Sequence, residues 1–258
     1  LKQGEKEIWL PSQDTGAYGK DINADLPTLL KQIISIKHNF KLRLGMANPN
    51  HILPMLSELI EIYKSPKIYK FLHIPIQSAS DKVLKDMNRF YKIKQVEEII
   101  TTFKKQFPHM VIATDIITAY PTETQKDHKA NIEFIKDYAP QVFNISRFTK
   151  HKETPAQALK ELSIKVAKTR ATELMDAHKQ GAKAAKEYLL KPNTKDKPIK
   201  VFVNKKLGQS LHQARDENYN LILIRNPDSK TTILGKTINV KITQLGIHHM
   251  IAESIRSQ

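Results

Sequence analysis

The chain alternates five times between a short apolar run and a longer segment with helical periodicity. The apolar runs predict buried strands at residues 7–12, 41–47, 71–76, 111–119 and 142–148. The segments between them repeat apolar residues at helical spacing, at 25–36, 52–63, 81–87, 92–107 and 125–138. Strand–helix units of about 30 to 35 residues give parallel strands joined by right-handed crossovers. Two α/β architectures fit this alternation, an open doubly wound sheet and part of a βα barrel.

The stretch FLHIPIQSASD, at residues 71–81, shows how one unit is built. Its apolar strand turns polar at Gln77 and Ser78, and Ser80 or Asp81 can then cap the following helix. Taken alone, this pattern also fits an ordinary strand, turn and capped helix.

Polar residues follow every one of the five predicted strands. Because parallel strands end at one edge of a sheet, where ligands bind in α/β folds, this pattern favours a pocket at the carboxyl edge. The residues are Gln13 and Asp14, Asn48 and Asn50, Gln77 and Ser78, Thr122 and Glu123, and Arg147 and Thr149.

Charge indicates the kind of partner. The 258 residues contain 42 Lys and Arg against 26 Asp and Glu, a formal net charge of +16, which favours a polyanionic partner, nucleic acid before membrane. A solubilising surface is the alternative. No apolar run approaches the roughly 20 residues of a membrane span, so we expect no membrane partner.

The sequence lacks the residues of several common chemistries. It contains no cysteine, so the chain itself provides no disulfide, thiolate nucleophile or cysteine-bound cluster. It also shows no P-loop, catalytic triad or metal motif, so we identify no catalytic residue and predict no metal site. Because the first residue is Leu1 and not methionine, we expect that a segment is missing upstream.

The carboxyl-terminal third has a different character. Residues 156–188 form a long basic helical pattern with Leu159, Leu162 and Val166 on one face, and residues 191–198 are typical of a linker. Short strands are predicted at 199–203, 207–214, 219–224, 237–242 and 247–252, with turns at 216–218, 226–229 and 246. This pattern predicts a small antiparallel barrel in the OB style.

That predicted barrel is basic, with twelve Lys and Arg residues against five Asp and Glu from residue 189 onward, a charge of +7. A compact basic barrel is typical of RNA-binding modules, although a structural tail domain is the alternative. The candidate RNA-binding residues are Lys200, Lys205, Lys206, Arg215, Arg225, Lys236 and Lys241.

Five stretches follow one another in the order and spacing of a known family. They are EIWLPSQDTGAYG (7–19), KLRLGMANPNHILP (41–54), FLHIPIQSASDKVLKDMNRFY (71–91), TDIITAYPTET (114–124) and FNISRFTKHKETPA (143–156). In these the chain resembles the radical S-adenosylmethionine (SAM) methylthiotransferases, and within them the archaeal and eukaryotic branch that modifies threonylcarbamoyladenosine beside the tRNA anticodon. The tail resembles their TRAM domain.

The resemblance implies an α/β fold of parallel strands. Residues 1–155 would form a partial radical SAM βα barrel without its first strand, 156–190 a basic helical connector, and 191–258 a TRAM-like, OB-like RNA-binding β-barrel. In this family a reduced 4Fe-4S cluster cleaves SAM, the resulting radical takes hydrogen from C2 of the adenine, and a methylthio group is installed there. The cysteines for both clusters precede the part that this chain resembles. We therefore expect the chain alone to be inactive, with tRNA and an amino-terminal cluster-binding segment or separate polypeptide as partners, in the cytoplasm.

The resemblance also implies which residues meet the cofactor. Gln13 and Asp14 would lie at the amino-acid end of SAM, and Gln77 and Ser78 near the ribose or the substrate. The remaining candidates, which would shape the adenine pocket or face its mouth, are Asp115, Thr122, Glu123 and Arg147.

Three departures from the family pattern bear on these roles. Glycines of the family are replaced by Ala79, Ala119 and Thr122. The residues that precede TPA are replaced by His151, Lys152 and Glu153. Glycine permits positive φ and close backbone approach to a ligand, so these losses predict weaker SAM binding. A noncatalytic tRNA- or RNA-binding paralogue, or one subunit of a split protein, is the alternative.

Overall fold

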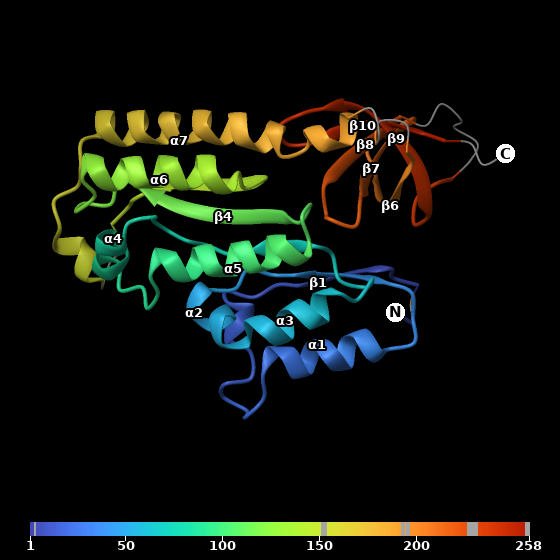
Figure 1. Cartoon of the computed structure of the whole chain (residues 1–258), viewed down its shortest axis with the longest axis horizontal. Helices are drawn as coiled ribbons and strands as arrows, with labels where there is room; N and C mark the ends of the chain where they lie inside the picture. The colour runs from blue at the N-terminus through green and yellow to red at the C-terminus, as the bar shows by residue number, and fades with distance from the viewer. Residues whose placement is uncertain (3, 151–153, 192–193, 195–196, 226–231, 256–258) are drawn as a thin grey trace.

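The computed structural model describes residues 1–2, 4–150, 154–191, 194, 197–225 and 232–255 (Figure 1). An α/β body makes up most of the molecule, and a small β-barrel lies at one end of it. Outside the described residues lie the predicted turn at 226–229, half of the predicted linker (192–193 and 195–196), and His151, Lys152 and Glu153.

Five parallel strands form the sheet part of the body, close to the predicted positions. They are β1 (Glu7–Leu10), β2 (Lys41–Leu44), β3 (Phe71–His73), β4 (Val111–Thr118) and β5 (Val142–Arg147). β1 pairs with β2, and β3, β4 and β5 pair in that order. A bridge between Leu42 and Ile68 joins the two groups, so the strands lie in space in their order along the chain. Within the described part of the chain, β1 pairs on one side only.

The helices follow the strands as the periodicity predicts. They are α1 (Leu26–Ser35), α2 (Pro49–Ile52), α3 (Leu56–Tyr63), α4 (Asp81–Asp86), α5 (Ile93–Gln106), α6 (Gln125–Tyr138) and α7 (Ile164–Ala184). Short 3-10 turns lie at Thr15–Ala17, Leu53–Met55, Pro155–Ala158 and Glu187–Leu190. The predicted cap of α4 is confirmed at Ser80, whose side chain accepts from the Val83 N–H. The Asp25 side chain caps α1 in the same way, by accepting from the Thr28 N–H.

Two helical predictions are wrong in detail. The helix predicted at 52–63 is interrupted by the 3-10 turn around Pro54, which has no N–H to donate and clashes with the preceding turn. The long pattern from residue 156 becomes a helix only at Ile164, where the Ser163 side chain accepts from the Val166 N–H.

The buried face of α7 also differs from the predicted one. Its buried residues are Arg170, Leu174, Ala177, His178 and Ala182, whereas Val166 is 37% exposed. This face packs against α6 and β5, and α6 and α7 run side by side over β4 in Figure 1. The basic helix is therefore a packed element of the body, and its lysines lie on the solvent side.

The two faces of the sheet differ in chemistry because side chains alternate along a strand. One face packs against the helices through a core that includes Leu42, Leu44, Leu72, Ile112 and Ile116. The opposite side, which we call the open face, carries Trp9, Arg43, His73, Asp115 and Asn144.

The carboxyl-terminal barrel is closed by five strands in the order β10-β8-β7-β6-β9. They are β6 (Ile199–Lys206), β7 (Leu211–Arg215), β8 (Leu221–Arg225), β9 (Thr237–Leu245) and β10 (Met250–Ser254), around a core that includes Val203, Ile222, Ile224, Val240 and Ala252. The predicted all-antiparallel pairing is wrong at one seam, since β8 and β10 are parallel. An odd number of strands cannot alternate in direction around a closed ring, so one parallel pair is required.

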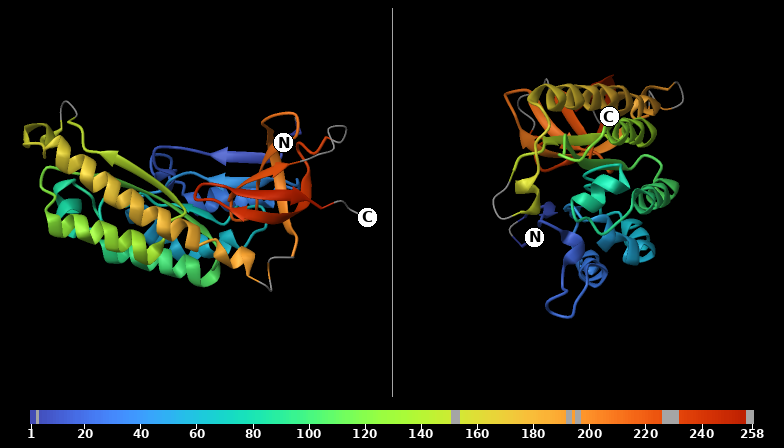
Figure 2. Two further views of the ribbon diagram at one scale, coloured as in Figure 1. Left: turned by 90° about the horizontal axis from the view of Figure 1, so that it is seen from above. Right: turned by 90° about the vertical axis from the view of Figure 1, so that its left-hand side faces the viewer.

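The barrel lies against the open face at the amino ends of β3 and β4. The centre of the Tyr219 ring is 4.8 Å from that of the Tyr69 ring and 5.1 Å from that of the Phe71 ring. The backbone of Tyr219 has a left-handed φ of 67°. The Arg43 guanidinium lies over both Phe71 and Tyr219. Figure 2 shows the barrel at one end of the body, beside the amino terminus. No helix in the described ranges is long and apolar enough to cross a membrane.

Candidate functional site

Asp14 ties the loop after β1 to the loop after β2. Its Oδ1 accepts from the N–H groups of Gly16 (3.0 Å) and Asn48 (3.1 Å), and its Oδ2 contacts Asn48 Nδ2 (2.6 Å) and His51 Nδ1 (2.7 Å). Burial raises the pKa of Asp14, but the bonds from Asn48 and His51 outweigh it and hold the pKa below its usual value. All four acceptor positions of this carboxylate are thus used within the protein. Its neighbour Gln13 is exposed.

Gln77 has the backbone expected of a functional position. Its φ is 62°, which is uncommon for a residue other than glycine and recurs at ligand sites. Its N–H donates to the Asp115 carbonyl (2.8 Å) and its carbonyl accepts from the Ile117 N–H (2.9 Å), so the pairing with β4 continues through this conformation. The side chain is half-buried and has no hydrogen bond within the described residues. It therefore remains available to a ligand at the carboxyl edge.

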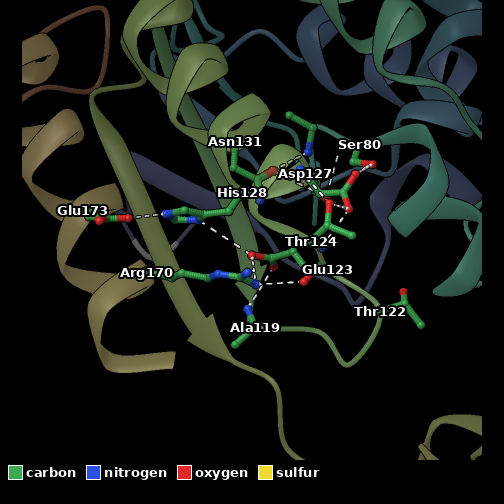
Figure 3. Close-up of polar contacts among 12 residues, drawn as sticks. Ser80, Ala119, Thr122, Glu123, Thr124, Asp127, His128, Asn131, Arg170 and Glu173 are labelled. Atoms are coloured by element: carbon green, nitrogen blue, oxygen red, sulfur yellow. Dashed lines mark hydrogen bonds and ion pairs between the residues drawn. The ribbon is translucent and has the colours of Figure 1, made fainter. Parts of the chain in front are cut away.

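Helix α6 fixes the loop that follows Gln77 (Figure 3). Asn131 Oδ1 accepts from the Ala79 N–H (2.6 Å), and Asp127 Oδ1 accepts from the Ser80 hydroxyl (2.6 Å). The fully buried Ser78 hydroxyl lies 3.4 Å from Asn131 Oδ1 and accepts from the Ser80 N–H (3.2 Å). Ser78 therefore shapes the loop from inside the protein.

Glu123 braces the loop that follows β4, and Figure 3 shows its partners. Its Oε2 accepts from the Ala119 N–H (2.9 Å), and its Oε1 accepts from Arg170 Nη1 (2.8 Å). Burial raises the pKa of Glu123, and the Arg170 charge and the Ala119 bond offset only part of that rise. His128 lies between this carboxylate and Glu173, with Nε2 2.6 Å from Glu173 Oε2.

The nearby Thr122 is also engaged, since its hydroxyl donates to the Asp86 carboxylate. Both predicted cofactor residues of this loop are therefore occupied by bonds inside the protein.

A polar row crosses the open face on three adjacent strands. Asp115 Oδ2 lies 2.8 Å from His73 Nε2, and Asp115 Oδ1 accepts from Asn144 Nδ2 at 2.7 Å. Burial raises the pKa of Asp115, but these two bonds outweigh it and hold the pKa below its usual value. The side chain is 24% exposed, and each oxygen takes one bond here, which leaves acceptor capacity for a ligand's ammonium or hydroxyl groups.

Arg147 is not brought together with the other candidates. In β5 it pairs with the buried Thr118, on the side opposite Asn144, and it lines a small pocket of 160 Å³ with Ala119, Leu162 and other residues near the start of α7. The sequence places Arg147 near the end of a predicted strand but does not show which side of that strand faces the other candidates.

Of the three replaced glycines, one occupies a conformation that favours glycine. Ala119 has a φ of 59°, whereas Ala79 and Thr122 are not among the residues with positive φ. The expected loss of backbone freedom is therefore confined to Ala119, whose N–H is held by Glu123.

Most of the candidate RNA-binding side chains lie on the barrel surface. Lys200, Lys205, Lys206, Arg225 and Lys236 are exposed, and Lys241 is half-buried. Arg215 instead lies at the contact with the body, where its guanidinium is 4.2 Å from the centre of the Tyr219 ring and donates to the Tyr219 carbonyl.

Three residues of this region, Arg170, His128 and Asn131, are not predicted by any sequence pattern. Each acts through a residue far along the chain, as Arg170 does with Glu123 47 positions away, so no local pattern reveals it. Asp127 had a detectable signal, because Thr124 and Asp127 form a capping box at the start of α6. In the described part of the chain, no three His, Asp or Glu side chains are grouped so as to hold a metal ion.

The sequence of the chain is similar to that of known proteins. A family model described as the radical SAM superfamily matches residues 7–135. A protein of Archaeoglobus fulgidus named "Probable threonylcarbamoyladenosine tRNA methylthiotransferase" is 36% identical over 100% of this chain and 58% of its own length. One of the same name from Pyrococcus horikoshii is 43% identical over 66% of this chain and 40% of its own length.

A Homo sapiens protein named "Threonylcarbamoyladenosine tRNA methylthiotransferase" is 34% identical over 99% of this chain and 43% of its own length. The chain thus spans about half the length of the curated relatives it matches. The resemblance seen in the five motifs is confirmed. Among solved structures, Elp3 of Methanocaldococcus infernus with an amino-terminal deletion aligns over 96% of this chain and 78% of that chain, with a TM-score of 0.47 and 11% identity.

Proposed function

The chain belongs to the radical SAM superfamily, and on that premise we propose that it is the carboxyl-terminal part of a tRNA methylthiotransferase that modifies C2 of threonylcarbamoyladenosine. The observation that carries this proposal is the length of the match, since a relative with that name aligns with the whole chain at 36% identity. A tRNA substrate would place the reaction in the cytoplasm.

The finer architecture belongs to the same proposal. The parallel strands in sequential order would be the later strands of a βα barrel within residues 1–155, and the closed barrel within residues 191–258 would be a TRAM domain. Residues 156–190 would join them along α6.

The chain's own residues do not fit an iron–sulfur cluster, because the sequence contains no cysteine. The clusters would be held by an amino-terminal segment or a separate polypeptide. SAM, when bound, would supply the radical that removes hydrogen from the adenine. For this group the open face and the adjoining carboxyl edge do fit, because the Asp115 carboxylate has free acceptor capacity and the Gln77 side chain has no partner within the described residues.

We assign direct contacts with SAM to Gln13, Gln77 and Asp115. The buried bonds of Ser78 and Glu123 make them positioning residues, as the four bonds of Asp14 do, and Thr122 acts in the same way through Asp86. For Arg147 a contact with SAM would require β5 to end differently, so we place it last among the candidates.

The exposed barrel lysines and Arg225 would bind tRNA phosphates. The barrel lies at the amino ends of the strands, whereas the candidate site lies at their carboxyl edge. The eight residues of β4 span roughly 26 Å at about 3.3 Å per residue, so a bound tRNA would extend along the body to place its base in the site.

A noncatalytic tRNA-binding paralogue is the second candidate. Ala119 favours it, because its left-handed φ places a strained alanine where the family has glycine, next to the candidate site. Such a protein would retain the basic barrel and bind RNA without SAM.

Two binding measurements distinguish these functions. The chain would be combined anaerobically with the polypeptide encoded upstream, iron and sulfide, and SAM binding would be followed by calorimetry. The enzyme proposal predicts binding that is weakened by Asp115→Asn and unchanged by Lys168→Met on the exposed side of α7. The paralogue predicts no SAM binding, with tRNA affinity that falls steeply as salt rises. If the chain binds neither SAM nor tRNA, both functions are contradicted.

A further inference from the structure

The loop between α4 and α5 exposes a large aromatic side chain. Phe90 is 77% exposed, whereas the adjacent Tyr91 is 6% exposed. The Tyr91 hydroxyl donates to the Ile76 carbonyl at 3.0 Å, next to Gln77 in the segment that follows β3. One aromatic ring therefore anchors the loop to the candidate site, and its neighbour projects into solvent.

The backbone that presents Phe90 is held in place on both sides. The Arg89 N–H donates to the Leu84 carbonyl (2.9 Å), the Ile93 N–H donates to Asp81 Oδ1 (2.8 Å), and Asn88 takes a left-handed φ of 56°. A ligand that contacts Phe90 therefore meets a surface that loses little conformational entropy on binding.

Three cations line the same groove as this ring and make no ion pair within the described residues. Among the described residues, no ion pair includes Lys85, Arg89 or Lys92, which line a groove of about 850 Å³ together with Phe90. The nearby Asp86 is already bound to Thr122 and lies 3.5 Å from Lys82. Asp81 also lines the groove, where its Oδ1 accepts from the Ile93 N–H. The cations outnumber this carboxylate, so the groove offers net positive charge beside an exposed aromatic face.

A single exposed Phe is ordinary, and so is a lysine-rich surface. An aromatic face within a basic groove fits unpaired nucleotides, whose phosphates pair with the cations while a base stacks on the ring. The groove also joins the candidate site, because Lys82 Nζ donates to the Thr122 carbonyl (2.7 Å) and the Tyr120 hydroxyl to the Asp86 carbonyl (2.9 Å).

We propose that Phe90, with Lys85, Arg89 and Lys92, forms a platform for an unpaired nucleotide of the RNA substrate beside the modified base. The identity of that RNA as a tRNA rests on the proposed function. The barrel and the platform would then contact the same RNA at opposite ends of the body.

The test compares RNA affinities of the full chain by fluorescence anisotropy. The probes are a synthetic anticodon stem–loop and the same stem closed by a non-nucleotide linker. Loss of stacking in Phe90→Ala should raise the Kd for the stem–loop about 5- to 150-fold and leave the Kd for the closed stem unchanged. Phe90→Tyr should keep the wild-type affinity because it keeps a stacking ring.

The outcomes separate this proposal from the function on which it rests. Equal stem–loop affinity in the wild type and Phe90→Ala overturns the platform and leaves the proposed function in place. No stem–loop binding by the wild type at low salt overturns both. Because Phe90 is exposed, Phe90→Ala should have the same urea midpoint of unfolding as the wild type.

A spectroscopic readout tests the stacking directly. A Phe90→Trp change in a Trp9→Phe background leaves the introduced indole as the single tryptophan of the chain. Oligouridylate should quench its emission. Unchanged emission at saturating RNA would overturn the stacking, and quenching by polyglutamate but not by RNA would assign the groove to an acidic protein partner instead.

Discussion

Replacing Arg170 with methionine should lower the free energy of unfolding by about 3 to 5 kcal/mol. Arg170 Nη1 donates to Glu123 Oε1 at 2.8 Å and to the Glu123 carbonyl at 3.0 Å. The first bond is worth about 1.5 to 3 kcal/mol because both groups are charged, and the second about 1 kcal/mol. The rest of the cost comes from the Glu123 carboxylate, which has no exposed surface and would remain buried without its cation.

This loss should depend on pH. Burial raises the pKa of Glu123 in the folded protein, and Arg170 opposes that rise. Without Arg170 the folded protein holds a proton on Glu123 more tightly than the unfolded chain does. The free energy of unfolding then falls as pH rises between the two pKa values, and protonation recovers it below them. The deficit should therefore be larger near pH 7 than near pH 5.

Urea unfolding followed by far-UV circular dichroism at both pH values measures the effect. Lys168→Met is the matched control, because Lys168 is exposed on the same helix and should change stability by less than about 0.5 kcal/mol. Adding Glu123→Gln to Arg170→Met should recover part of the loss, since no charge is then buried. A loss below about 1 kcal/mol near pH 7, or a double variant less stable than the sum of the single changes, would show that Arg170 does not stabilise the buried Glu123 carboxylate in this way.

Three further outcomes are expected. Ala119→Gly and Ala139→Gly should each raise the free energy of unfolding by about 0.5 to 1 kcal/mol in urea titrations. Both alanines have left-handed φ, and removing this backbone strain gains more than the entropy that glycine adds to the unfolded chain costs. Lower stability of both variants would contradict this. Burial raises the pKa of Asp216 to about 6, so lowering the pH from about 7 to about 5 should stabilise the wild type by about 1 kcal/mol more than Asp216→Asn, and parallel pH profiles would count against it. Changing Lys205 and Lys206 to Gln should reduce the slope of log Kd for tRNA against log salt by about 2, and an unchanged slope would remove both from the interface.

Local patterns determined most of the secondary structure. Helix α6 begins and ends where its periodicity predicts, and Asp25 caps α1 because its short carboxylate reaches the Thr28 N–H. The errors have specific causes. Pro54 breaks a helix whose apolar spacing is otherwise regular, and the seam between β8 and β10 follows from ring closure, which no segment of the sequence expresses by itself.

The candidate site was predictable in position but not in the division of roles. Polar residues after parallel strands identify the carboxyl edge, and the motifs identify the family. Whether a side chain is available to a ligand depends on partners distant in sequence. The Glu123 carboxylate is bound by Arg170, and the Asp14 carboxylate is bound by Asn48 and His51. Gln77, whose φ is left-handed, has no side-chain partner in the described ranges.

The nucleosides of tRNA provide the most direct test of the proposed function. Total tRNA from cells that lack the gene for this chain would be digested and analysed by mass spectrometry. We expect the methylthio derivative of threonylcarbamoyladenosine to disappear and its unmodified precursor to accumulate. The wild-type gene should restore the derivative, and a copy carrying Asp115→Ala should not. An unchanged level of the methylthio nucleoside in the deletion strain would contradict the proposed function.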